Sequence, residues 1–196
     1  PSAEPSASTQ SSSPSTSGDA VSQARELIIE KEGFREMPYY DVNAFRAGYG
    51  SDTYTTESGE VKQVVEGQKV SRADADRDID RRIKTEFMPR AKAGVGEDVW
   101  STLPSQAKAA LTSIAYNYGS LPDRVTKVAK STGGNLEAIA KAVEGLKTDD
   151  KGINANRRQY EADLIRNSRV QPASPINRSP SASSKGNVSI INAPGQ

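Results

Sequence analysis

The sequence predicts an α+β fold that is mainly helical, with a small antiparallel β-hairpin lobe, a larger helical lobe and a long helix joining the two. Apolar residues recur at helical spacing in several segments between residues 19 and 168. Aromatic, β-branched and glycine residues gather instead in residues 45–65, a pattern typical of strands and tight turns. A highly charged segment with a narrow apolar stripe lies between this stretch and the most apolar helix.

Both ends of the chain have a composition typical of linkers. Eleven of the first 18 residues are Ser or Pro, and residues 169–196 repeat this bias. Such segments bury too little apolar surface to order themselves, so we expect disordered arms at 1–18 and 169–196 around one domain at 19–168. The apolar run at residues 188–191 is a weak signal for a strand that needs a partner.

Composition excludes several classes of function. The chain has no cysteine and no histidine, which rules out disulfides, thiolate or imidazole metal sites and Cys-His or Ser-His-Asp catalysis. We therefore expect no metal and no cofactor. The net charge is +1, but the two arms together carry +2 and the domain between them carries −1. A nearly neutral domain is a poor nucleic-acid binder. No stretch is apolar enough for a transmembrane segment or a signal peptide, so we expect no membrane partner.

The first expected helix begins at Asp19 as N-cap and ends at Glu32, because Gly33 tolerates the left-handed conformation that closes many helices. Strands are expected at 45–50, 54–56 and 61–65. Ser71 and Asp74 resemble a capping box that opens the long bridging helix, whose alternating charges favour a solvated face over an ionic binding surface.

The remaining elements are expected to be helices. Pro104 opens the most apolar helix, which ends at Gly119 and should form the core of the larger lobe. A short helix follows around Val125, Asn135 caps the next one, and the last runs from about 154 to 167. Trp100 is expected to pack between elements, with sugar stacking as the alternative.

Glu32 and Asp41 are the main catalytic candidates. The C-terminal end of a helix favours cations, so a carboxylic acid there is a plausible proton donor, and Asp41 precedes an expected hairpin. Hydrolysis of a sugar–sugar bond requires two such carboxyl groups, one to protonate the leaving oxygen and one to activate or orient water. From spacing alone, two solvated surface acids are the more common explanation.

Three motifs that occur in a fixed order along the chain favour the catalytic interpretation of Glu32 and Asp41. They are Glu32-Gly33-Phe34-Arg35 with Tyr40-Asp41 and Gly48-Tyr49-Gly50, then Tyr116-Asn117-Tyr118-Gly119, and finally Gly152-Ile153 with Arg157-Arg158 and Glu161. Together they resemble the phage-type lysozymes, the muramidases of T-even and lambdoid phages. The resemblance implies a lysozyme-like fold, Glu32 as the acid, Asp41 as the residue that positions water, and Arg157 in contact with Glu32.

The chain departs from the family pattern at two positions. The loop after Asp41 is one residue shorter, so Arg46 stands where the resemblance predicts a Thr, and Ser51 replaces a frequent His. Ser51, Asp52 or Thr53 are the candidates to supply the function of the missing Thr, and the sequence does not choose among them. Thr53 is counted with the catalytic candidates, and Tyr49, Ser51, Asn117 and Arg157 with the substrate-binding ones. For Asn117, a helix-cap role is an equal alternative.

The resemblance thus predicts a peptidoglycan muramidase, a glycoside hydrolase that cuts the β-1,4 bond between N-acetylmuramic acid and N-acetylglucosamine. A lytic transglycosylase acting on the same bond, or a non-catalytic wall-binding module of a phage tail, are the alternatives. The expected partners are peptidoglycan and other phage tail or virion proteins. The expected location is the virion or the host periplasm and cell wall.

Overall fold

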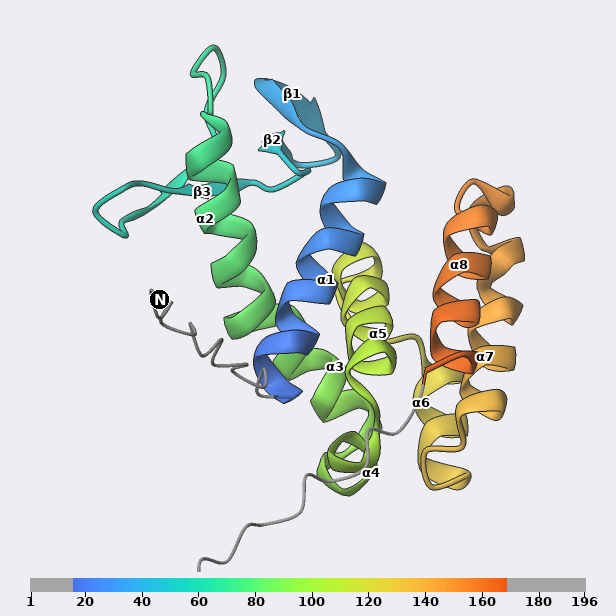
Figure 1. Cartoon of the computed structure of the whole chain (residues 1–196). Helices are drawn as coiled ribbons and strands as arrows, with labels where there is room; N and C mark the ends of the chain where they lie inside the picture. The colour runs from blue at the N-terminus through green and yellow to red at the C-terminus, as the bar shows by residue number, and fades with distance from the viewer. Residues whose placement is uncertain (1–15, 169–196) are drawn as a thin grey trace, which may run out of the picture.

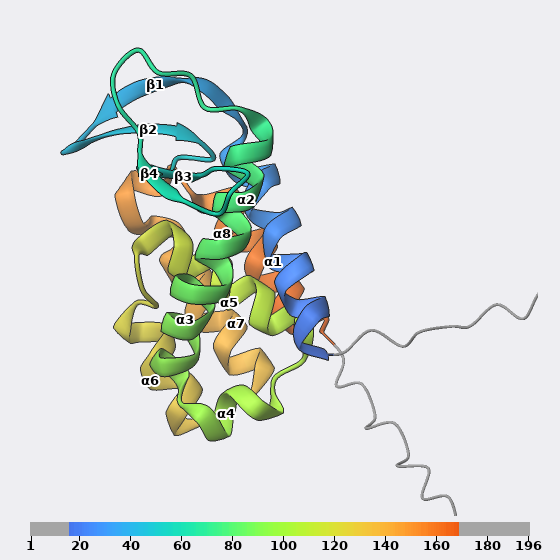
Figure 2. The same ribbon diagram turned by 90° about the vertical axis from the view of Figure 1, so that its left-hand side faces the viewer.

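The computed structural model describes residues 16–168. The two predicted arms lie almost entirely outside this range, as does the apolar run at 188–191. Two small hairpins form one end of the molecule, and helices form the rest (Figures 1 and 2). The predicted α+β class with a helical majority is confirmed.

The elements follow one another in a simple order. The strands are β1 (Arg35–Asp41), β2 (Ala44–Gly48), β3 (Thr53–Thr55) and β4 (Val61–Gln63). The helices are α1 (Thr16–Glu32), α2 (Arg72–Arg82), α3 (Met88–Val95), α4 (Glu97–Thr102), α5 (Ser105–Tyr118), α6 (Asp123–Ser131), α7 (Leu136–Glu144) and α8 (Ala155–Arg166). A π-helical turn, η1 (Ile83–Phe87), joins α2 to α3, and 3-10 turns, η2 (Gly145–Gly152), join α7 to α8.

Helix α1 begins earlier than predicted and ends where predicted. It starts at Thr16, so Asp19 lies inside the first turn, where its carboxylate accepts a hydrogen bond from Gln23 instead of capping the helix. The prediction of an Asp19 N-cap was therefore wrong. At the other end, Gly33 has a φ of 67° and its amide donates to the carbonyl of Ile29, which closes the last turn at Glu32.

The sheet lobe consists of two separate antiparallel hairpins, β1 with β2 and β3 with β4. Sequence analysis did not foresee β1. It contains Pro38, which removes a donor from the ladder, and the register is irregular between Arg35 and Tyr39. From Tyr39 onward the pairing is regular, with Arg46 opposite Tyr39.

The predicted bridging helix is present as α2, η1 and α3 in succession. Ser71 caps it, accepting from the amide of Asp74, and its stripe of Ala75, Ile79, Ile83 and Phe87 is buried. The expectation that its charged residues are merely solvated was wrong for Asp78, which is only 1% exposed.

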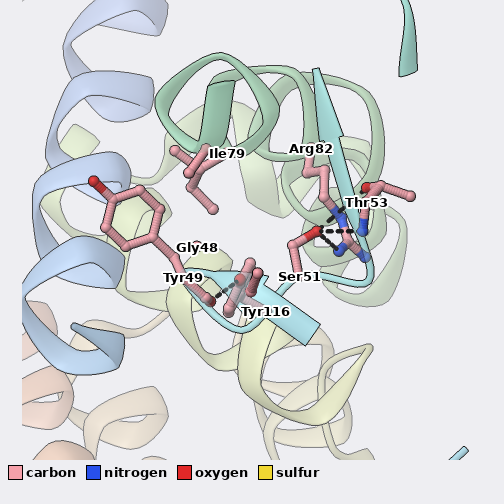
Figure 3. A pocket seen from close by; sticks show the side chains of 9 residues that line it. Gly48, Tyr49, Ser51, Thr53, Ile79, Arg82 and Tyr116 are labelled. Carbon is pink, nitrogen blue, oxygen red and sulfur yellow. Dashed lines mark hydrogen bonds between the residues drawn. The ribbon is translucent and has the colours of Figure 1, made fainter. Parts of the chain in front are cut away.

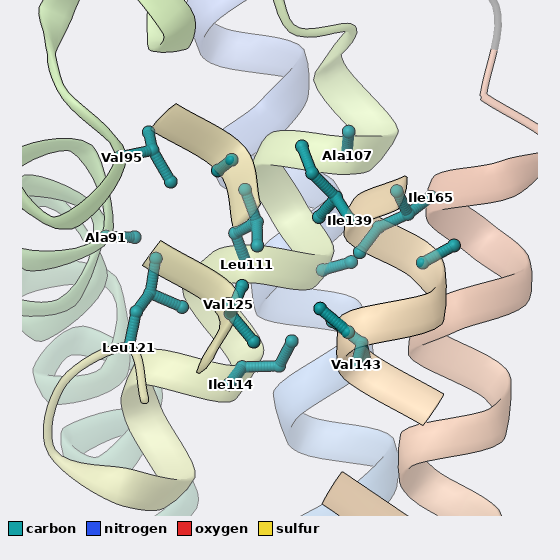
Figure 4. Packing of buried hydrophobic residues seen from close by; sticks show 14 of the residues in the cluster. Ala91, Val95, Ala107, Leu111, Ile114, Leu121, Val125, Ile139, Val143 and Ile165 are labelled. Carbon is teal, nitrogen blue, oxygen red and sulfur yellow. The ribbon is translucent and has the colours of Figure 1, made fainter. Parts of the chain in front are cut away.

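Helix α5 forms the centre of the molecule and packs against α1, α3 and α8. Its residues Leu111 and Ile114 belong to the larger of two buried apolar clusters, together with Val125, Ile139 and others from α3, α6, α7 and α8 (Figure 4). The second cluster lies under the hairpins and includes Ala109 of α5. Because α5 contributes to both, it fixes the sheet lobe relative to the helical lobe.

Candidate active site

Glu32 projects from the last turn of α1 toward the C-terminal helix α8. Its carboxylate accepts a hydrogen bond from Nη1 of Arg157 at 2.6 Å, although 125 residues separate the two in sequence. The side chain of Glu32 is 23% exposed and that of Arg157 only 7%. This ion pair is the contact that the resemblance implied.

Arg157 divides its donors between two acids. Its Nε lies 3.2 Å from Glu161, and its Nη2 donates to the hydroxyl and the carbonyl of Ser113 on α5. Glu161 is fully buried and also pairs with buried Arg158 at 2.9 Å. Burial raises the pKa of Glu161 while the two guanidinium groups oppose that rise, and burial lowers the pKa of Arg158. The cluster fixes Arg157 firmly behind Glu32.

The loop after β2 passes directly beside Glu32. A Cβ atom on Gly50 would lie 3.8 Å from Oε2 of Glu32 and 3.9 Å from the hydroxyl of Tyr39, and the φ of Gly50 is 83°. Glycine suits this position because it adopts the left-handed conformation and leaves the space open. The structure therefore brings the Tyr39 hydroxyl and the Glu32 carboxylate to the same side of one peptide segment.

The Tyr116 hydroxyl of α5 holds the loop that follows β2 in place. It donates to the carbonyl of Tyr49 at 2.6 Å (Figure 3). Burial, followed by the negative charge of Glu32, raises the pKa of Tyr116. The phenol therefore remains a donor at physiological pH and positions the backbone next to the acid.

Asp41 ends β1, and its side chain is half exposed. Nε of Arg46, on β2, lies 3.2 Å from its Oδ2. Nη1 of the same guanidinium donates to the carbonyl of Gly50 at 3.3 Å. Asp41 is thus connected through Arg46 to the loop that borders Glu32.

The phage lysozyme family model matches residues 29–161, a segment that contains Glu32, Asp41 and Arg157. The chain belongs to the phage lysozyme family. It is a muramidase, a glycoside hydrolase whose substrate is the peptidoglycan of the cell wall. A search of curated proteins found no significant match.

Several solved structures share the fold of this phage lysozyme. A lysozyme mutant of phage P22 is 19% identical with a TM-score of 0.54, over 74% of this chain and 95% of the other. The muramidase domain of SpmX from Asticaccaulis excentricus is 20% identical with a TM-score of 0.53, over 72% and 93%. The active form of the P1 phage endolysin Lyz is 19% identical with a TM-score of 0.53, over 73% and 82%.

Ser51 and Thr53 of this phage lysozyme bind an internal carboxylate. Their hydroxyls donate to Oδ2 of Asp78 at 2.8 and 2.9 Å. Figure 3 shows the hydrogen bond that Arg82 donates to Ser51. They line a cavity of about 10 Å³, roughly the space of one water molecule. Asp52 pairs with Arg82 at 3.2 Å. None of the contacts within residues 16–168 joins these three side chains to Glu32 or Asp41.

The other substrate-binding candidates differ in exposure. Tyr49 is 2% exposed, with its hydroxyl bound to Asp76, so its side chain packs inside the lobe and its backbone faces Tyr116. Asn117 is exposed at the end of α5, where its side-chain oxygen Oδ1 accepts a hydrogen bond from Nη2 of Arg158 at 3.0 Å. Trp100 is 7% exposed and belongs to the helical core. Of these, Asn117 has the most accessible side chain.

Sequence reasoning missed Tyr39, Tyr116 and Asp78 as parts of this region. Tyr39 lies on the strand that was not foreseen, and Tyr116 was noted only as part of the motif at residues 116–119. Asp78 was hidden in a charged run, where only its four-residue step from Asp74 and Arg82 could have indicated a distinct face. Within the described residues, no cluster of three or more acidic side chains has metal-binding geometry, and no helix has the length and apolar character of a membrane span.

Proposed function

We propose that this phage lysozyme hydrolyses the β-1,4 bond from N-acetylmuramic acid to N-acetylglucosamine, with Glu32 as the general acid and Asp41 as the residue that positions water. The observation that carries this assignment is the placement of Glu32, partly exposed, against buried Arg157 and beside the Gly50 backbone. Glu32 is the last residue of α1 and Asp41 is the last residue of β1, so strand β1 lies between the two carboxyl groups in the sequence.

The proposed reaction needs one proton donor and one water. Glu32 gives its proton to the glycosidic oxygen as the bond to the anomeric carbon breaks, and the sugar hydroxyl departs. Water attacks the anomeric carbon from the opposite face and passes its proton to Asp41. The configuration is thereby inverted, and the product has a free reducing end.

The roles of Arg157 and Glu161 in this scheme are to orient the acid. Two acids share Arg157, so Glu32 does not take the whole positive charge of the guanidinium. In this proposal Arg157 fixes the direction of the Glu32 carboxyl group and contacts the substrate only where Glu32 leaves it accessible. Thr53 and Ser51 act on the site through the loop that they hold to Asp78.

The test is mass spectrometry of the fragments released from purified peptidoglycan by the parent and by Glu32→Gln. The variant should lose about 10²- to 10⁴-fold in rate, because positioned acid catalysis contributes about that much. Glu30→Gln is the matched control, because Glu30 is an exposed acid on the same helix, paired with Lys31. It should retain the parental rate. A Glu32→Gln variant that cleaves as fast as the parent would refute the assignment.

The same spectra distinguish hydrolysis from the two alternatives. Hydrolysis yields reducing ends, whereas a lytic transglycosylase yields anhydro ends that are lighter by one water. A folded parent that binds peptidoglycan and releases no fragments would instead be a non-catalytic wall-binding module.

The proposed place of action is the host periplasm or the phage particle. The Ser- and Pro-rich segments on either side of the domain have the composition of linkers, which suits a domain joined to other virion or tail proteins. Detection of the chain in purified phage particles by peptide mass spectrometry would support a virion location, and its presence only in infected cells would contradict it.

A further inference from the structure

Three side chains share one face of the β1–β2 hairpin. Tyr39 and Arg46 are directly opposed Cα partners, so they project to the same side of the two strands. Asp41 lies two residues beyond Tyr39 along the strand and projects to that side as well. This face carries the Tyr39 hydroxyl that lies next to Gly50.

Arg46 spans the distance from Asp41 to the loop beside Glu32. Its Nε is 3.2 Å from Oδ2 of Asp41, and its Nη1 donates to the Gly50 carbonyl at 3.3 Å. Two separate nitrogens therefore hold two separate groups, a carboxylate on β1 and a backbone carbonyl after β2. A planar guanidinium is suited to such two-point contacts, because its donors keep a fixed geometry.

Stability alone does not account for this arrangement. An exposed ion pair contributes about 0–1 kcal/mol, and the Asp41 side chain is 50% exposed. Nε of Arg46 is buried, and its 3.2 Å contact with the Asp41 carboxylate is an ion pair that lacks hydrogen-bond geometry. Such a contact stabilises a buried N–H less than a well-aligned hydrogen bond does, so the arrangement calls for an explanation other than stability.

We propose that Arg46 is the positioning residue for Asp41. It holds the carboxylate near the Gly50 carbonyl, so that the solvent-facing part of the carboxylate is directed toward the attacking water. The inference rests on the proposed function, because it concerns how Asp41 performs the role assigned there.

The test is steady-state kinetics of Arg46→Ala on a soluble oligosaccharide of the glycan strand. We expect kcat to fall about 10- to 100-fold with KM nearly unchanged, because a small displacement of a catalytic group costs rate rather than affinity. Arg46→Lys keeps the charge but cannot make both contacts, and it should restore part of kcat. Lys69→Ala is the matched control, since it removes a cation that pairs with Glu36 on the same strand β1.

A double-mutant cycle separates positioning from a general structural effect. If Arg46 acts through Asp41, the Arg46→Ala/Asp41→Asn variant should be within about two-fold of Asp41→Asn alone. A structural defect would instead multiply with the loss at Asp41. Parental kcat in Arg46→Ala, or multiplicative losses in the double variant, would overturn the inference while leaving the muramidase assignment intact. A parent without any cleavage would overturn both.

Discussion

At the scale of single residues, Asp78 has the most contacts of any carboxylate near the site. It is 1% exposed and accepts hydrogen bonds from the hydroxyls of Ser51, Thr53 and Thr55 and from Arg81. All three hydroxyls come from the segment that leads from the Gly50 loop into β3. One carboxylate on α2 therefore determines where this segment lies.

Replacement of Asp78 by Ala should destabilise the protein by about 3 kcal/mol, because the substitution leaves buried donors without an acceptor. Asp80→Ala is the control on the same helix. Asp80 pairs with Arg25 but is 40% exposed, and its loss should cost about 0–1 kcal/mol. Urea unfolding of the two variants and the parent measures both values. Equal midpoints for the two variants would show that Asp78 has no special structural role.

Short-range sequence signals predicted the position of Glu32 but not the contacts that depend on distant residues. Glu32 could be placed at a helix end because Gly33, its neighbour, determines where the helix stops. The burial of Asp78 could not be predicted, because it depends on hydroxyls 23 to 27 residues earlier in the chain. Likewise, Arg46 could be identified as a departure from the family, but its contact with Asp41 required the register of a hairpin whose first strand contains Pro38.

At the scale of elements, the contact between β2 and α2 is unusually close. Gly48 has a φ of 61°, and a Cβ atom there would lie 2.8 Å from the Cβ of Ala75. Glycine is required here both for the backbone conformation and for the close approach. The hairpin thus packs directly against the bridging helix. This contact also positions the loop at Gly50, which lies two residues after Gly48.

Gly48→Ala should destabilise the protein more than Gly59→Ala. Both positions have positive φ, which costs an alanine about 1–2 kcal/mol, but Gly59 has no atom near its missing Cβ. The clash with Ala75 should add about 1–3 kcal/mol at Gly48 only. Thermal or urea unfolding measures the difference. Equal destabilisation would show that β2 can move away from α2 at no cost.

At the scale of the whole molecule, stability depends on pH through acid–base pairs between elements. Arg166 on α8 pairs with Glu137 and Glu144 of α7 and with Asp163. The hydrogen bond from Arg166 lowers the pKa of Glu144 below its ordinary value of 4.5. A carboxyl group with a lowered folded pKa stabilises the protein above its unfolded pKa, and this contribution is lost as the pH falls through the folded pKa.

Arg166→Ala should therefore lower the urea midpoint at pH 7 and have little effect once the pH is well below 4.5. Added salt should reduce the difference at pH 7, because these groups are partly to largely exposed. Lys127→Ala, which removes an exposed cation paired with Asp123 on the same helix, is the control and should change little at either pH. A pH-independent loss in Arg166→Ala would indicate lost packing instead of lost ion pairs.

The overall architecture was predictable because it rests on local helical patterns. The caps at Ser71 and Asn135, the apolar face of α5 and its end at Gly119 all follow from short stretches of sequence. The start of α1 at Thr16 was not predictable from the Asp19 cap signal, since Asp19 bonds to Gln23 within the helix. Strand β1 was missed because its pairing with β2, not its own composition, makes it a strand.

The contact between Glu32 and Arg157 joins two residues that are synthesised at different times. Glu32 leaves the ribosome long before Arg157, which follows it by 125 residues. During synthesis the acid exists without its partner, and α8 cannot yet dock against α5. The nascent chain therefore lacks the complete proposed catalytic centre until nearly the whole domain has emerged, so we expect wall-cutting activity to arise first in a finished domain.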